Sequence, residues 1–190
     1  MKILNIVNMK INAKQKKQEQ GFSILEIVVM VALVSVAFVG IVKILNKTTQ
    51  LRYITRHDLM AEALAKEGIE LVEQIRNDNI ENADPFATDL MLLGVGDDDT
   101  RTIRLDYTGV SSIAEVSGAD DAGAVLKYDA TDYYQYSTGT DSIFGRAITL
   151  TYQDDVNTPT AYMEVKSDVY WEYKGVGHTH TIESRAYDTN

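Results

Sequence analysis

The sequence has no cysteine, only two prolines, one tryptophan and three histidines among its 190 residues. The absence of cysteine excludes disulfide bonds, thiolate metal sites and cysteine nucleophiles. Positive charge is also scarce, because 18 Lys and Arg residues face 28 Asp and Glu residues and leave a net charge of −10. A surface that binds nucleic acid needs a basic stripe to meet the phosphates, so we expect no nucleic-acid partner.

The few positive charges are concentrated at the N-terminus. Residues 1–21 contain five lysines and one glutamate, for a net charge of +4. Because the whole chain has a net charge of −10, residues 22–190 have a net charge of −14. Lysines that precede an apolar span favour a cytoplasmic location for that end of the chain, whereas the acidic total has little effect on orientation. The sequence therefore predicts a cytoplasmic N-terminus and a translocated body.

A long apolar run follows the lysines. Residues 27–42 read IVVMVALVSVAFVGIV, and Ser35 is their only polar side chain. Extended to Phe22 and Leu45, the run has about 24 residues, which at 1.5 Å per residue is enough to cross a hydrocarbon core of roughly 30 Å. We interpret residues 22–45 as a transmembrane helix.

Three interpretations of this N-terminal segment compete. A secretory signal peptide could end at the small residues Ser35-Val36-Ala37, although the cut would then fall inside the apolar run. A plain signal-anchor helix fits the length and the charge but leaves Glu26 unexplained. A carboxylate inside a span costs about 2.5–3.5 kcal/mol on insertion scales, unless it lies near enough to the membrane surface to reach the head groups.

The third interpretation accounts for Glu26. The string Gly21-Phe22-Ser23-Ile24-Leu25-Glu26-Ile27, after a basic leader and before a long apolar run, resembles the signature of type IV prepilins and of type II secretion pseudopilins. That resemblance implies cleavage after Gly21 by a prepilin peptidase, and Phe22 as the new, N-methylated first residue. Glu26 would then face the terminal ammonium group of a neighbouring subunit or of its own chain. A buried charge is tolerable when an opposite charge meets it, and such a pair acts more as a register device than as a source of net stability.

A second helical pattern continues beyond the span. From Ile54 one face of an amphipathic helix recurs at spacings of three and four residues, flanked by Glu and Lys residues. Asn77-Asp78-Asn79 and Pro85 are expected to end it. The segment Ala61–Arg76 is also similar to the corresponding stretch of many minor pilins and pseudopilins, so we expect a minor subunit. The face comprises Ile54, Asp58, Ala61, Ala65, Gly68, Val72 and Ile75.

The periodicity changes to that of strands in the remaining residues. Alternating side chains predict strands at residues 103–107, 148–152, 161–173 and 178–187, with turns at 154–159 and 174–177. Residues 126–136 could hold a strand or an irregular aromatic segment, and 109–124 read as a surface loop. We predict an α+β fold, in which a long N-terminal helix packs on a C-terminal antiparallel sheet of about four strands. The expected domains are a cleavable leader (1–21), a transmembrane or fibre-core helix (22–45), an amphipathic stalk helix (46–80) and a β head (81–190).

Catalytic and ligand-binding motifs are not found. Asp97, Asp98 and Asp99 form a weak calcium candidate, because they lack the alternating ligand spacing of an EF-hand loop. His178 and His180 lie two residues apart, and we interpret them as part of a polar strand face. We expect no metal site otherwise, no cofactor and no enzymatic activity.

The resemblance implies a structural subunit of a type IV pilus-like or type II secretion pseudopilus fibre. Its partners would be other pilin subunits, the prepilin peptidase, an assembly ATPase, a membrane platform protein and the inner membrane. The chain would wait there as a single-pass precursor before it enters an extracellular or periplasmic fibre. The alternatives are a membrane-anchored extracellular binding domain that never polymerises, and a secreted enzyme or adhesin cut near Ala37.

Overall fold

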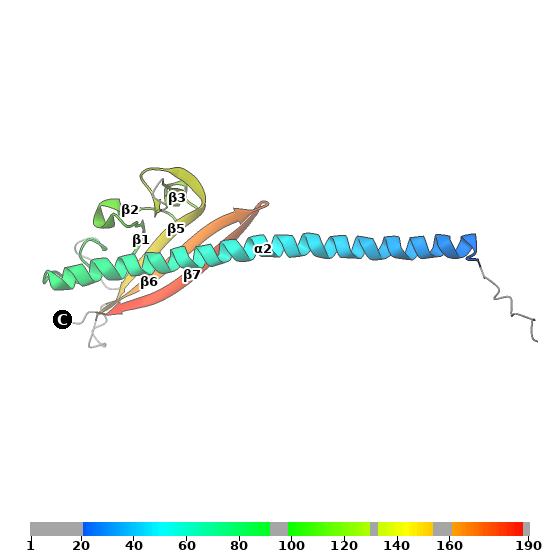
Figure 1. The fold of residues 1–190 in the computed structure, drawn as a ribbon. Coiled ribbons are helices and arrows are strands. Elements are labelled where there is room, and N and C mark those ends of the chain that lie inside the picture. The colour runs from blue at the N-terminus through cyan, green and yellow to red at the C-terminus, as the bar shows by residue number, and fades with distance from the viewer. Residues whose placement is uncertain (1–20, 92–98, 130–132, 154–160, 188–190) are drawn as a thin grey trace, which may run out of the picture. The chain divides into compact units, whose positions relative to one another are not determined.

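In the computed structural model the described residues are 21–91, 99–129, 133–153 and 161–187 (Figure 1). One long helix, α2 (Ile24–Glu81), precedes all of the strands. The chain divides into two compact units, Met1–Thr49 and Gln50–Asn190, so the second part of α2 belongs to the same unit as the sheet. The predicted α+β class is confirmed, with a long N-terminal helix and an antiparallel sheet after it.

The described strands form one antiparallel sheet of seven strands. The 14-residue strand β5 is its centre: along one edge it pairs with β1 and β3, and along the other with β6. β6 pairs in turn with β7, while β2 and β4 extend β1 and β3. The elements are β1 (Thr100–Arg104), the 3-10 helix η1 (Gly109–Ser112), β2 (Ala114–Glu115), the 3-10 helix η2 (Ala122–Ala124), β3 (Val125–Tyr128), β4 (Tyr134–Gln135), β5 (Thr140–Gln153), β6 (Tyr162–Tyr173) and β7 (Val176–Tyr187).

The second part of α2 lies along β5, β6 and β7 (Figure 1), and the core fills the space between them. Alternate residues of β6 are buried from Met163 to Trp171, as a strand with one covered face requires. The helix contributes a stripe that agrees with the predicted one from Ala61 onward. Leu64, which we expected to widen the stripe, is buried; Leu71, expected to do the same, is half-buried; and Ile69 is an addition. Its buried residues are Ala61, Leu64, Ala65, Gly68, Ile69, Val72, Ile75 and Asn79.

The helix ends at Glu81, one residue past the expected stalk boundary, and it runs through Asn77-Asp78-Asn79, which we expected to end it. Two bonds of a Schellman motif close it, from the Ala83 N–H to the Ile80 carbonyl (3.1 Å) and from the Asp84 N–H to the Asn79 carbonyl (2.9 Å). Ala83 has a φ of 60°, the left-handed conformation that this motif needs. The Asn79 side chain is buried and donates to the Thr88 carbonyl (2.8 Å), so it holds the following loop instead of ending the helix.

Three other expectations are corrected. The sheet has seven described strands where we expected about four, because short strands in residues 100–135 pair with β5 and with one another. The last hairpin turns on only two residues, Lys174 and Gly175, whose φ angles of 53° and 77° suit the tight turn that joins twisted strands. The expected surface loop at 109–124 packs on β5, where Gly145 lets the Ala119 carbonyl approach; a Cβ there would lie 2.1 Å from that oxygen.

We predict that Gly68→Ala destabilises the protein by up to about 2 kcal/mol. Alanine gains about 1 kcal/mol of helix propensity, but its Cβ would lie 2.6 Å from Ser167 Oγ and 3.3 Å from Arg146 Cδ. Overpacking a close contact costs typically 1–3 kcal/mol. The free energy of unfolding can be measured by urea titration of the full chain in detergent micelles, with the fluorescence of the buried Trp171 as the signal.

The double variant Gly68→Ala with Ser167→Ala is the matched control, because it removes the nearest obstructing atom. We expect it to recover part of the lost stability. A Gly68→Ala protein that is more stable than the parent by the full helix-propensity gain of about 1 kcal/mol would show that the helix does not approach the sheet closely at this point.

Candidate functional site

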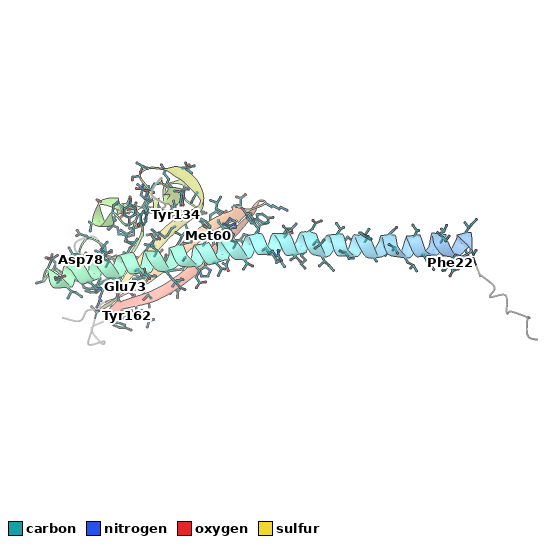
Figure 2. All side chains as sticks on the ribbon, viewed as in Figure 1. Phe22, Met60, Glu73, Asp78, Tyr134 and Tyr162 are labelled. Carbon is teal, nitrogen blue, oxygen red and sulfur yellow. The ribbon has the colours of Figure 1, made fainter. Side chains whose placement is uncertain are left out.

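The candidate site is the start of helix α2, where Gly21 and Phe22 precede the first turn. The Ser23 carbonyl accepts the first helical hydrogen bond from Ile27 (3.1 Å), so Ser23 is the N-cap residue. Phe22 is 68% exposed and stands at the end of the helix in Figure 2. The three predicted site residues therefore lie together at the N-terminal end of α2: Gly21 and Phe22 precede the helix, and Glu26 is in its first turn.

Glu26 is the only acidic residue of this first turn and is exposed. Ser23 and Glu26 have the spacing of a capping box, in which each side chain bonds to the other residue's backbone N–H. Neither side chain makes such a bond in the part of the chain that the structure describes. The positive end of the helix dipole is worth about 0.3–1 kcal/mol to a carboxylate. That is less than the cost of about 2.5–3.5 kcal/mol for placing it in a membrane, so Glu26 needs a further partner wherever the helix is buried in an apolar environment.

The helix that follows is apolar on every side. Seventeen large apolar side chains between Phe22 and Leu45 are each at least 46% exposed. By length and composition, α2 contains a segment able to cross a membrane, with a mean hydropathy of 2.8 over its best window. Its internal hydroxyl group is satisfied locally, because Ser35 Oγ donates to the Val31 carbonyl at 2.7 Å. Glu26 is thus the one charged group between Ile24 and Val42, and no side chain or backbone group of its own helix pairs with it in the described structure.

The glycines in and before α2 differ in how closely other atoms approach them. A Cβ added to Gly21 would meet no atom within 4 Å, and the same is true of Gly40. Nothing in the described fold therefore requires glycine at position 21, in contrast to Gly68, which sits against the sheet.

A buried arginine fixes the other part of α2 to the sheet. Arg146 of β5 is fully buried, and its guanidinium donates to the carbonyls of Leu64 (2.9 Å) and Leu105 (2.7 Å). It also lies 3.3 Å from the Glu67 carboxylate. Burial lowers the pKa of Arg146, but the neighbouring Tyr136 and Glu67 outweigh burial and raise it above its ordinary value, so the group stays charged. The side chain thereby connects the helix, β5 and the segment after β1.

A second buried polar group holds the loop beside it. Asp106 is 1% exposed and accepts hydrogen bonds from the backbone N–H groups of Thr108 and Tyr136, each 3.0 Å long, and from the Thr108 hydroxyl (2.6 Å). Burial raises the Asp106 pKa, yet these hydrogen bonds together lower it below its ordinary value. The Tyr136 hydroxyl in turn donates to the Arg146 carbonyl at 3.0 Å, which links this loop to the arginine.

The two histidines of β7 do not form the polar face that we expected. Both are half-buried on the side of the sheet that α2 covers. His178 stacks on Trp171, with 5.3 Å between ring centroids, and His180 Nδ1 lies 3.1 Å from the Asp58 carboxylate of α2. In the described ranges no group of three or more histidine and acidic residues could hold a metal ion.

Several predicted positions lie outside the described residues. These are residues 1–20 of the predicted leader, and Asp97 and Asp98 of the calcium candidate. Asp99 is described, and its carbonyl accepts from the Tyr152 N–H at 3.0 Å. This backbone bond joins the residue before β1 to β5.

Sequence reasoning missed Arg146, Asp106 and the pair between Asp58 and His180. For Arg146 and for Asp58, the sequence pattern contains a feature that could have indicated the role. Arg146 shares its parity with Phe144 and Ile148 and so occupies a core-facing position of an apolar strand. Asp58 interrupts an otherwise apolar helical stripe. The pattern around Asp106 contains no such feature, because its role depends on donors that the chain brings from up to 30 residues away.

Comparisons with protein-family models, with curated proteins and with solved structures found no match. The residues of the N-terminal segment therefore carry the functional inference.

We expect Arg146→Ala to lower the free energy of unfolding by about 3–5 kcal/mol, since it opens a cavity and removes the partners of buried groups. Glu67→Gln is the matched control, because the Glu67 side chain is 39% exposed and such a surface pair is worth about 0–1 kcal/mol. Urea denaturation of the full chain in micelles measures both. Equal, small losses for the two variants would mean that the arginine does not hold the helix on the sheet.

Asp106→Asn tests the buried carboxylate through pH. Because its folded pKa is lowered, Asp106 contributes stability at every pH above its unfolded pKa of about 4, and that contribution is lost as the pH falls through the folded pKa. At pH 7 we expect the Asn variant to be about 1–3 kcal/mol less stable. The difference in the free energy of unfolding between the parent and the variant should become smaller below pH 4. A difference that stays constant down to pH 2 would show that the Asp106 carboxylate does not stabilise the fold in its ionised form.

Proposed function

We propose that this chain is a structural subunit of a type IV pilus-like or type II secretion pseudopilus fibre, cleaved after Gly21 and assembled through the N-terminal part of α2. The single observation that supports this most is Glu26. It is a lone carboxylate in the first turn of α2, where the residues up to Val42 are otherwise free of charge, five residues after a glycine that the described fold does not need.

Cleavage supplies the missing partner of Glu26. Hydrolysis of the bond after Gly21 creates a positively charged amine on Phe22, four residues before the carboxylate. Inside a bundle of apolar helices, that amine on a neighbouring copy or on the same chain neutralises Glu26. Because both charges lose their hydration, the pair adds little net stability, but any arrangement that leaves either one unpaired is costly. The pair therefore selects one register of the helices.

The remaining steps follow from the same proposal. A membrane-embedded peptidase removes the leader, and the mature chain is held in the inner membrane by its apolar segment. An assembly ATPase and a membrane platform protein extract it into the growing fibre. There the apolar helices of other subunits replace the lipid, so seventeen exposed apolar side chains lose contact with hydrocarbon without meeting water.

The experiment is to replace Glu26 and follow cleavage and assembly separately in the host cells. We expect Glu26→Ala to be cleaved within about twofold of the parent. Fibre yield should fall by at least about tenfold, because an unpaired buried amine costs several kcal/mol. Mass spectrometry of the N-terminus measures cleavage, and electron microscopy with fractionation measures fibre. Ser35→Ala is the control, because that hydroxyl is satisfied within its own helix.

A membrane-anchored binding domain that does not polymerise is the second candidate, because the length of the apolar helix serves an anchor equally well. It predicts a chain that keeps Met1 and forms no fibre, with Glu26→Ala indistinguishable from the parent. Normal assembly of cleaved Glu26→Ala subunits would instead show that the charge pairing is wrong.

A further inference from the structure

The face of α2 that points away from the sheet is polarised along its length. We call the exposed residues 52, 56, 59, 63, 70 and 81 the outer ridge. Its N-terminal end presents Arg52 and Arg56, and its C-terminal end presents Glu70 and Glu81. The exposed acids Glu73 and Asp78 flank the same end (Figure 2).

These charges form no ion pair within the part of the chain that the structure describes. Between the two ends the charge is neutralised locally, because Lys66 Nζ lies 2.6 Å from the Glu62 carboxylate one turn earlier. The ridge also exposes an apolar side chain, Leu59, of which 61% is accessible. A separated basic end and acidic end on one helix face complement a second copy of the same face that is displaced along the helix axis.

Helix geometry fixes that displacement. Arg52 and Glu70 are 18 residues apart, which is five turns of 3.6 residues, so they project from the same line on the helix surface. At 1.5 Å per residue the separation is about 27 Å. A parallel helix displaced by that distance places its Glu70 opposite Arg52, and its Glu73 and Gln74 near Arg56.

We propose that the outer ridge is an interface between two copies of this chain, in which parallel α2 helices are displaced axially by about 27 Å and Arg52 of one copy meets Glu70 of the next. This rests on the proposed fibre function and deepens it. An exposed ion pair adds little affinity, so the ridge sets the register of these two copies while burial of the apolar segment supplies the association. The neighbour whose amine meets Glu26 is a different copy, because Phe22 and Glu26 are only four residues apart. An alternative occupant of the arginines is the anionic head-group layer of a membrane, and the test below separates the two.

The absence of cysteine makes the register directly measurable. One full-length copy carries Arg52→Cys and a second, differently tagged copy carries Glu70→Cys, and both are produced together in the host. A disulfide forms only where the two Cα atoms come within about 7 Å. We expect mild oxidation of isolated fibres to join the two tagged chains. Arg52→Cys with Ala63→Cys is the control pair, since residue 63 lies on the same ridge and reports a displacement of about 17 Å, and it should remain unlinked.

Charge reversal supplies a second readout. Arg52→Glu should reduce fibre yield by about tenfold, because an attraction becomes a repulsion of similar size. Glu70→Arg in the same chain should restore the yield. Both residues are exposed, so the urea midpoint reported by Trp171 should not change in any variant.

The outcomes distinguish the two levels of the proposal. Fibres that cross-link through the control pair, or whose yield survives Arg52→Glu, overturn the 27 Å register while leaving the fibre function intact. Loss of binding to vesicles of anionic phospholipid in Arg52→Glu, with no rescue by Glu70→Arg, assigns the arginines to the membrane and also overturns it. A chain that keeps residues 1–21 and forms no fibre overturns the proposed function itself.

Discussion

The protein depends on one constraint: a helix with apolar side chains on all sides has to be kept out of water. Burying a large apolar side chain is worth about 1.5–3 kcal/mol, so the seventeen exposed between Phe22 and Leu45 represent tens of kcal/mol. No part of this chain covers them among the described residues. Their environment must come from lipid or from other proteins, and in the proposed function Glu26 determines which arrangement of that environment is tolerable. A plain anchor gains nothing from such a carboxylate, whereas a bundle of cleaved subunits can use it to fix the register.

The second part of the same helix has the opposite design. It buries one narrow stripe on the sheet and exposes charge on its other side. Close approach at Gly68 and the buried guanidinium of Arg146 determine how the helix sits on the strands. Such polar contacts through a core are costly to break and specify one arrangement, which suits a unit that presents a fixed outer face to neighbours.

The sequence predicts the features that depend on local pattern. The apolar span, the amphipathic stripe after Ile54 and the strands later found as β5, β6 and β7 all have clear periodicity, and the α+β class follows from them. The Schellman end of the helix was missed, because Ala83 adopts a conformation that is usually taken by glycine. The short strand β2 was missed too, since two residues carry no period and form only by pairing with a neighbour. Residues 126–136, where a strand was one of two interpretations, hold most of β3 and all of β4. Arg146 shows the limit most clearly: its strand position is readable, but its acceptors Leu64 and Leu105 are 82 and 41 residues away.

The start of the candidate site was predictable because it is contiguous in sequence. Gly21, Phe22 and Glu26 need no tertiary fold to come together, and the structure adds that Glu26 has no local partner and that Gly21 has no packing role. The most direct test of the central claim is the intact mass of the native polypeptide isolated from the host. The account predicts a chain that begins at Phe22 and carries one added methyl group on its amine. A chain that retains residues 1–21 would contradict it, because Glu26 would then have no amine to meet.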